Sequence, residues 1–129
     1  LTASMITFVP EPGHILLCDF DMANVPPEMR KKRRVAVVSP RSYNRAHRCV
    51  VVPFSATAPT NPTAAHVTFG VGLYRSLTVP TWAICDALGH VSFLRLDRVR
   101  SGKVFLSEML NEQDIERVEI GPRHALGMV

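Results

Sequence analysis

Hydrophobic positions along the chain fall in short runs that are separated by turn-forming residues, a pattern typical of a β-rich domain. The clearest run, Cys49-Val-Val-Val-Pro-Phe-Ser55, is rich in β-branched residues. Gly70, Gly72 and Gly89 mark turns or bulges between later runs. We expect strands at residues 14–20, 35–39, 49–55, 66–69, 80–86 and 90–96.

Polar and proline-containing segments connect these runs. Residues 21–32 contain Pro26-Pro27 and end in several charges, and residues 56–65 contain Pro59 and Pro62, so both are expected to be long loops. Residues 42–44 are expected to form a turn. We interpret residues 1–129 as one domain, with residues 1–11 as an irregular segment before the first strand.

The hydrophobic spacing becomes helical near the end of the chain, from Leu106 to Leu126. Ser107 is suited to cap a short turn, and Asn111 to cap a longer helix that carries Asp114 near its start. Gly121-Pro122 predicts a kink or break, because an interior proline costs a helix about 3 kcal/mol. Several short strands followed by one helix favour a mainly β fold, a small closed barrel with a C-terminal α-helix packed against it.

Composition limits the class of protein further. Hydrophobic residues make up 47% of the chain and charged residues 20%, as in ordinary globular proteins, and no apolar run is long enough for a membrane helix. The N-terminal residues lack the features of a secretory signal. The three cysteines, Cys18, Cys49 and Cys85, each lie in an apolar run, so we expect buried thiols in a reduced, cytoplasmic protein. No ligand spacing indicates a metal site, and we expect no cofactor.

Charge is distributed unevenly along the chain. Residues 30–48 contain eight basic residues and no acidic one, whereas the chain from Ser107 onward is mainly acidic. A basic segment on an otherwise balanced domain indicates a polyanionic partner, either a nucleic acid or an acidic protein. A solvated loop is the alternative interpretation, and charge alone does not distinguish the two.

Six motifs occur in an order that resembles the MazF/PemK family of toxins. They cover most of the chain from Pro12 to about Leu126, and their order and spacing carry the resemblance more than any single motif does. They are Pro12-Gly13-His14-Ile15-Leu16, Arg33-Arg34-Val35-Ala36-Val37-Val38-Ser39-Pro40, Tyr43-Asn44, Val50-Val51-Val52-Pro53-Phe54-Ser55-Ala56-Thr57, Cys85-Asp86 and Arg95-Leu96-Asp97.

The resemblance implies an SH3-like barrel of the CcdB/PemK type and a two-fold homodimer. It also implies an endoribonuclease that cuts single-stranded RNA without a metal and leaves 2′,3′-cyclic phosphate and 5′-hydroxyl ends. An acidic, partly disordered antitoxin is the implied partner; it would lie in the substrate groove, where its carboxylates imitate phosphates.

Two positions depart from the family pattern. Arg34 stands where the family usually has proline, so either Arg33 or Arg34 is the equivalent arginine, and counting back from Pro40 favours Arg33. Ile84 stands where the PemK branch has an arginine before its Cys-Asp pair. Arg95, Arg33 or His90 are the candidates to replace that arginine.

RNA cleavage by the 2′-hydroxyl requires a base, charge stabilisation at phosphorus and an acid for the leaving oxygen. We predict Arg33 as the charge-stabilising group, because a guanidinium can contact two phosphate oxygens. By the resemblance, Asp86 is the general base or the group that orients an arginine, although a turn-forming role is common at such a position. The third predicted catalytic residue is Ser55, as a hydrogen-bond donor to phosphate. The residues predicted to bind RNA are Arg34, Thr57, Lys32, Arg41 and Arg95.

Other residues and functions compete with this hypothesis. The five histidines show no spacing typical of a paired-histidine nuclease, and Trp82 is more typical of a core or dimer-interface residue than of a base-stacking one. A non-enzymatic toxin of the CcdB type, which poisons DNA gyrase by binding, is the alternative function, and Ile84 is the residue that favours it. A plain SH3-like nucleic-acid-binding module is a third possibility, for which Asp86 would be dispensable.

Overall fold

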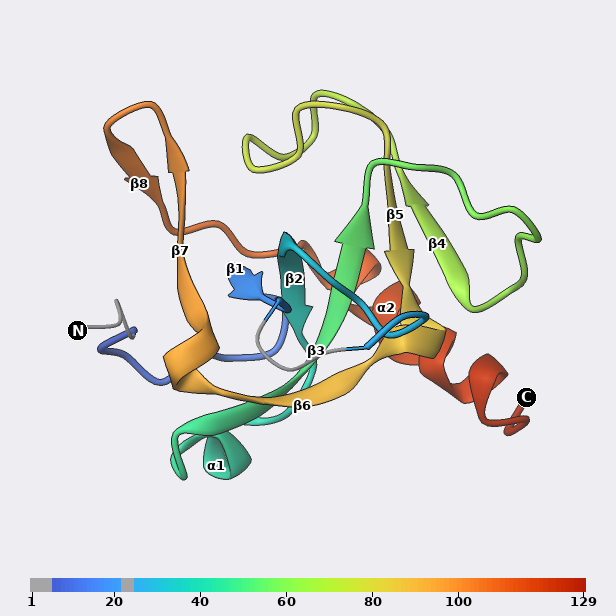
Figure 1. The fold of residues 1–129 in the computed structure, drawn as a ribbon, viewed down its shortest axis with the longest axis horizontal. Coiled ribbons are helices and arrows are strands. Elements are labelled where there is room, and N and C mark those ends of the chain that lie inside the picture. Colours follow the sequence, from blue (N-terminus) through green and yellow to red (C-terminus); the bar gives the residue numbers. More distant parts are fainter. Residues whose placement is uncertain (1–5, 22–24) are drawn as a thin grey trace.

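The computed structural model describes residues 6–21 and 25–129 as a mainly β protein with one long helix (Figure 1). Residues 22–24, within the loop predicted at 21–32, lie outside the described residues, as do residues 1–5. Residues 6–11 form neither helix nor strand. The strands are β1 (Ile15–Asp19), β2 (Lys32–Val37), β3 (Arg48–Ser55), β4 (His66–Phe69), β5 (Thr81–Ile84), β6 (Gly89–Ser92), β7 (Leu96–Ser101) and β8 (Val104–Leu106). The helices are α1 (Arg41–Asn44), α2 (Glu112–Ala125) and the 3₁₀ turns η1 (Cys85–Ala87) and η2 (Phe93–Arg95).

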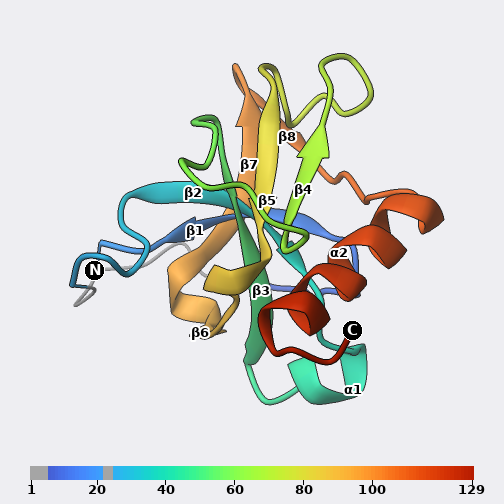
Figure 2. The same ribbon diagram turned by 90° about the vertical axis from the view of Figure 1, so that its right-hand side faces the viewer.

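The strands form one antiparallel sheet in the order β4-β5-β3-β2-β1-β7-β8, with β6 paired to the first half of β3. Figure 2 shows β1 and β2 crossing β7 and β5 at a steep angle, so the sheet curls around its interior. In the described ranges no ladder joins β8 to β4, and these two strands remain edges. The fold class predicted from the sequence is confirmed, with a curled sheet whose first and last strands stay unpaired with each other.

Alternation along the strands divides the apolar residues between the two faces of the sheet. Ala36 and Val52 belong to one cluster, which also contains Val118 of α2. Val35 and Val51, one position away, belong to a second cluster. Burial of both faces explains why these strands read as continuous apolar runs in the sequence. We call the face of Ala36 the helix face and that of Val35 the outer face.

Helix α2 begins where the sequence predicts, because the Asn111 side chain accepts a hydrogen bond from the Asp114 backbone N–H at 2.8 Å. The predicted break at Gly121-Pro122 is wrong, since the helix continues to Ala125. Proline cannot donate to the carbonyl four residues earlier, that of Val118. The buried Cys85 thiol lies 4.0 Å from that oxygen and occupies the side from which a donor is missing.

Several boundaries in the second half of the chain differ from the prediction. The strand expected at 80–86 ends at Ile84, and Cys85–Ala87 turns as η1. The strand expected at 90–96 divides into β6, η2 and the start of β7. Leu106 lies in β8 and not in a helix. The β7–β8 hairpin was not predicted because charged residues such as Arg98, Arg100 and Lys103 interrupt its short apolar pattern.

The turn after β2 is one short helix, α1, held by the fully buried Asn44. Asn44 Nδ2 donates to the carbonyls of Pro10 at 2.9 Å and Ser39 at 3.0 Å, and Ser39 Oγ in turn accepts the Val50 N–H. These bonds fix β3 against β2 and explain why Ser39-Pro40 and Tyr43-Asn44 occur together. Neither helix of the described ranges has the length and apolar content needed to cross a membrane.

Candidate functional site

A basic pocket lies where the start of β2 meets the end of β3. Its volume is about 180 Å³, and the segment Ser76–Val79 of the β4–β5 connection closes one side. Four of the predicted site residues line it: Lys32, Arg33, Arg34 and Ser55. We call this the arginine pocket. Residues 22 positions apart in the chain meet here because β2 and β3 are antiparallel, with Val35 opposite Pro53.

The two arginines leave β2 on opposite faces of the sheet. Arg33 shares the outer face with Val35, and Arg34 shares the helix face with Ala36. Arg33 Nε donates to the Arg30 carbonyl at 2.8 Å, which ties its guanidinium to the β1–β2 connection. Arg34 Nε is buried and has no hydrogen-bond partner among the described residues. An unpaired buried donor costs about 1–3 kcal/mol, so Arg34 is a ready donor for an anion that enters the pocket.

Ser55 ends β3 and joins the pocket to the loop that follows. Its Oγ accepts the backbone N–H of Thr57 and donates to the Thr57 carbonyl, both at 3.1 Å. The Ser55 hydroxyl can reach a phosphate only by giving up the bond to that carbonyl. The Thr57 side chain is exposed on the loop and does not line the arginine pocket.

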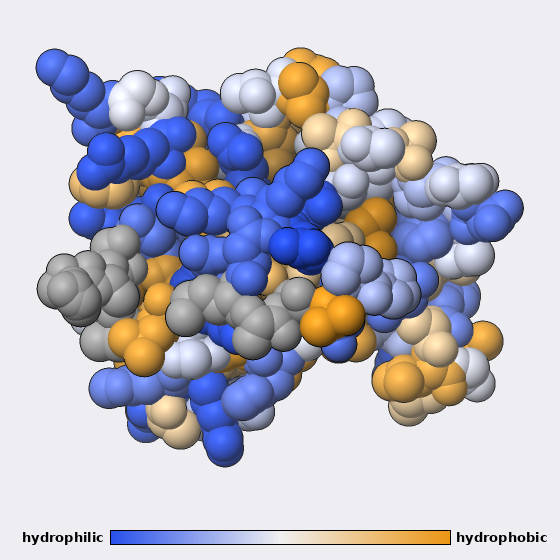
Figure 3. Space-filling model, viewed as in Figure 1, coloured by the Kyte–Doolittle hydropathy of each residue, from blue (hydrophilic) through white to orange (hydrophobic). Residues whose placement is uncertain are grey.

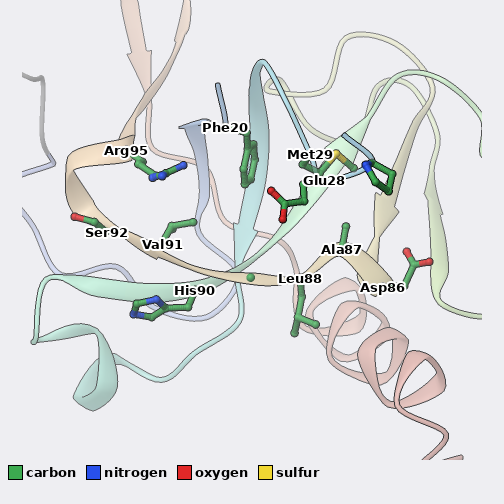
Figure 4. Close-up of a pocket in the computed structure, with 12 residues that line it drawn as sticks. Phe20, Glu28, Met29, Asp86, Ala87, Leu88, His90, Val91, Ser92 and Arg95 are labelled. Carbon is green, nitrogen blue, oxygen red and sulfur yellow. The ribbon is translucent and has the colours of Figure 1, made fainter. Parts of the chain in front are cut away.

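Asp86 lies outside the arginine pocket, in η1. It lines a separate cavity of about 720 Å³ between Pro27–Met29 and the segment Asp86–Ser92 (Figure 4). Arg95 lines the same cavity, but Figure 4 places Asp86 and Arg95 at opposite ends of it. The structure therefore separates the two predicted catalytic groups Arg33 and Asp86 into different cavities.

The direct partner of Asp86 is His66, a residue that the sequence analysis did not select. His66 Nε2 lies 3.3 Å from Asp86 Oδ1, and His66 Nδ1 accepts the Thr63 backbone N–H at 3.0 Å. With Nδ1 acting as acceptor, the ring proton is on Nε2, so the N–H side of the ring is in contact with the Asp86 carboxylate. The His66 side chain is 8% exposed, whereas that of Asp86 is 50% exposed. The carboxylate is thus oriented by a buried ring and still accessible.

His66 also lies next to the position that departs from the family pattern, because it pairs with Ile84 across β4 and β5. It is the basic side chain in contact with Asp86, unlike Arg95 at the far end of the cavity. His90, on β6, points away from Asp86 in Figure 4. Sequence reasoning had no signal for this contact, since 20 residues separate His66 from Asp86 and nothing local links them.

Arg41 is not brought together with the other predicted RNA-binding residues. It is the exposed first residue of α1, at the end of the molecule opposite to the start of β2 (Figure 1). Lys32, by contrast, is exposed at the rim of the arginine pocket. Figure 3 shows hydrophilic side chains gathered over the centre of the face from which the β1–β2 connection is seen.

The cysteines are buried free thiols, as predicted. Burial raises the pKa of Cys18, Cys49 and Cys85 to about 12, so they are neutral near physiological pH. Among the residues that the structure describes, no group of three or more His, Cys, Asp and Glu side chains is arranged to hold a metal ion.

Comparison with known proteins identifies the family. Residues 11–121 match the family of PemK-like, MazF-like toxins of type II toxin–antitoxin systems. The match spans the whole sheet and most of α2, including both cavities. The chain belongs to this family, and the resemblance seen in the sequence is confirmed.

Individual proteins are also similar to this chain. The uncharacterized protein YifN of Escherichia coli K12 is 28% identical over 148 residues, covering 96% of this chain and 98% of YifN. The crystal structure of MazF from Deinococcus radiodurans superposes with a TM-score of 0.71 at 19% identity, covering 94% of this chain and 99% of that one. An endoribonuclease from a mycobacterial species, solved in complex with its cognate antitoxin, has a TM-score of 0.66 at 18% identity, covering 93% and 97% of the two chains. At these identities the solved structures establish a common fold.

Proposed function

We propose that this chain is an endoribonuclease toxin that cuts single-stranded RNA by attack of the 2′-hydroxyl, without a metal or other cofactor. The products would carry 2′,3′-cyclic phosphate and 5′-hydroxyl ends. The observation that carries the proposal is the arginine pocket, where Lys32, Arg33, Arg34 and Ser55 surround one small cavity. Family membership supports the toxin class, and one of the solved proteins with the same fold is an endoribonuclease.

The pocket suits a phosphate whose negative charge increases in the transition state. Arg33 and Arg34 approach from the two faces of β2, so their guanidinium groups can contact different oxygens of one phosphate. Arg34 Nε, buried without a partner, would gain its missing acceptor on binding. Donors already in place in a partly buried site stabilise developing charge without reorganisation.

Asp86 is the proposed general base, and its half-exposed carboxylate held by His66 supports that role. Its position sets a condition on the substrate. Pro27–Met29 of the β1–β2 connection line the Asp86 cavity. Lys32–Arg34, at the start of β2 where this connection ends, line the arginine pocket. RNA bound at Arg33 has to extend along this connection to reach Asp86.

The proposed partners follow from the same surfaces. An acidic, partly disordered antitoxin would cover the arginine pocket with carboxylates in place of phosphates.

A homodimer would bury exposed apolar side chains such as Val71, Leu73 and Val79 on the β4–β5 connection. Trp82, which is only half-buried on β5, is a further candidate for this interface. We propose the cytoplasm as the compartment.

The separation of Asp86 from the arginines keeps the gyrase-poisoning function as a second candidate. The two are distinguished by assaying the purified protein in parallel on a pool of single-stranded RNA and on DNA supercoiling by gyrase. RNA cleavage with unchanged supercoiling is expected. Inhibited supercoiling with intact RNA would establish the non-enzymatic alternative.

A further inference from the structure

The β7–β8 hairpin carries an exposed aromatic ring between two arginines. Arg100 lies opposite Phe105 in the ladder, and Arg98 precedes it by two residues on the same face. The Arg98 Cζ atom is 3.6 Å from the centre of the Phe105 ring, and the Arg100 Cζ atom is 4.6 Å from it. Within the described ranges neither guanidinium forms an ion pair with a carboxylate. Two adjacent cations are thus held by a π system and retain free N–H groups.

This cluster lies on the same face of the sheet as Arg33. Cys18 pairs with Arg33 on one side and with Leu96 on the other, so these three residues share the outer face. Strand alternation then puts Arg98 and Arg100 on that face, two strands away from Arg33. In Figure 3 hydrophilic side chains continue from the hairpin, at the upper left, to the centre of the face. A polyanion on Arg33 therefore meets the hairpin without crossing to the helix face.

We propose that the β7–β8 hairpin is a second contact surface for the single-stranded RNA backbone, in which Arg98 and Arg100 hold phosphates that flank the cleaved one. This proposal rests on the proposed function, since it assumes that the substrate is RNA. Stacking on Phe105 limits the motion of both guanidinium groups, which reduces the ordering cost of each phosphate contact. Phe105 is 36% exposed, and uncharged side chains would cover its ring equally well. An anionic ligand therefore explains why both residues that cover it are arginines.

Salt dependence of binding tests the proposal. The ligand is a single-stranded RNA with 2′-O-methyl groups throughout, which cannot be cut by its own 2′-oxygen, and Kd is measured from low to moderate salt. Each phosphate contact to a single strand contributes about 0.7 to the slope of log K against log salt. Arg98→Gln with Arg100→Gln should therefore reduce the slope by about 1.4.

Matched controls separate this effect from general charge. Arg45→Gln with Arg123→Gln removes the same two charges from α1's C-terminal end and from α2, and should leave the slope at the wild-type value. Phe105→Leu keeps both arginines, so it should weaken binding while changing the slope little. Thermal melts of every variant establish that each one is folded.

Equal slopes for the hairpin variant and the wild type would overturn the proposal. A changed sedimentation mass of the hairpin variant would also overturn it, because the hairpin would then be a contact between two copies. If the wild-type protein itself does not bind the RNA, the proposed function fails first, and that result is distinct from the other two.

Discussion

Nε2 of His66 lies 3.3 Å from Oδ1 of Asp86, while the Thr63 N–H donates to Nδ1, the other ring nitrogen. Nδ1 is therefore occupied, and the Nε2 side of the ring faces the Asp86 carboxylate. This contact joins Asp86, in the turn η1, to His66, the first residue of β4. It gives the Asp86 carboxylate one defined direction at the edge of its cavity.

Asp86→Asn is expected to abolish or greatly weaken cleavage and to leave RNA binding unchanged or slightly tighter. Asn keeps an oxygen at the position in contact with His66 Nε2, so the local structure should survive while the base is lost. Removing a negative charge near phosphates can only help a polyanion to bind. Single-turnover cleavage and binding of uncleavable RNA measure the two effects separately.

On the other side of the His66–Asp86 contact, we compare two variants, His66→Gln and His66→Leu. Gln retains an N–H donor and should preserve more cleavage than Leu does.

Near-normal cleavage by Asp86→Asn would remove the carboxylate from the mechanism, and would favour the gyrase-binding alternative.

Arg33→Ala is expected to lower kcat by orders of magnitude, since loss of one charge-stabilising donor commonly costs about 3–4 kcal/mol of barrier. Arg34→Ala should cost much less and act mainly through KM, because Arg34 offers a donor to the bound phosphate from the helix face. Steady-state cleavage of one defined RNA by both variants measures the difference. The opposite order of effects would mean that the family arginine corresponds to Arg34.

Gly121→Ala should lower the thermal stability. A Cβ at this position would lie 2.4 Å from Cys85 Sγ and 2.8 Å from Cys85 Cβ, closer than real contacts allow. Replacing Gly by Ala within a helix gains about 1 kcal/mol, but overpacking a core costs about 1–3 kcal/mol. The clash is therefore expected to outweigh the gain.

Calorimetric melts of Gly121→Ala with and without Cys85→Ala give the test. Cys85→Ala removes the sulfur but keeps the Cβ contact at 2.8 Å, so it should relieve part of the cost of Gly121→Ala in the double variant. Gly70→Ala, where a Cβ meets nothing within 4 Å, is the control and should melt near the wild type. Equal melting of Gly121→Ala and Gly70→Ala would show that α2 and η1 are not packed as closely as described.

A dimer is expected in solution, because exposed Val71, Leu73 and Val79 give the β4–β5 connection an apolar surface. Sedimentation at micromolar concentration measures the mass, and Leu73→Lys is expected to shift it toward the monomer. Lys103→Glu, at the tip of the β7–β8 hairpin, changes charge elsewhere and should not. A wild-type monomer with full activity would exclude the dimer as a requirement.

The first half of the fold could be predicted because local signals agree there. Val35–Val38 and Cys49–Ser55 are β-branched runs bounded by proline, charge or polar residues, and both became strands. The β7–β8 hairpin was missed because Arg98, Arg100 and Lys103 resemble a charged loop, and only the ladder to β1 identifies it. Pro122 misled the helix prediction, since a contact with Cys85 from a distant turn decides that position.

In the candidate site, too, the features set by local sequence could be predicted and those set by long-range contacts could not. Arg33, Arg34 and Ser55 could be grouped in advance. The two arginines directly precede one predicted strand and Ser55 ends the next, and antiparallel neighbours bring such ends together. The link from Asp86 to His66, and its separation from Arg33, depend on how β4 and β5 pair with the rest of the sheet. That pairing is long-range and leaves no mark in the local sequence.

The most direct test of the account is to incubate the purified protein with a mixed pool of single-stranded RNA in the presence of EDTA and to map the ends of the products. The account predicts cleavage that persists in EDTA, with 2′,3′-cyclic phosphate on one side of each cut and a 5′-hydroxyl on the other. Cleavage that stops with EDTA and returns with magnesium or manganese would contradict it.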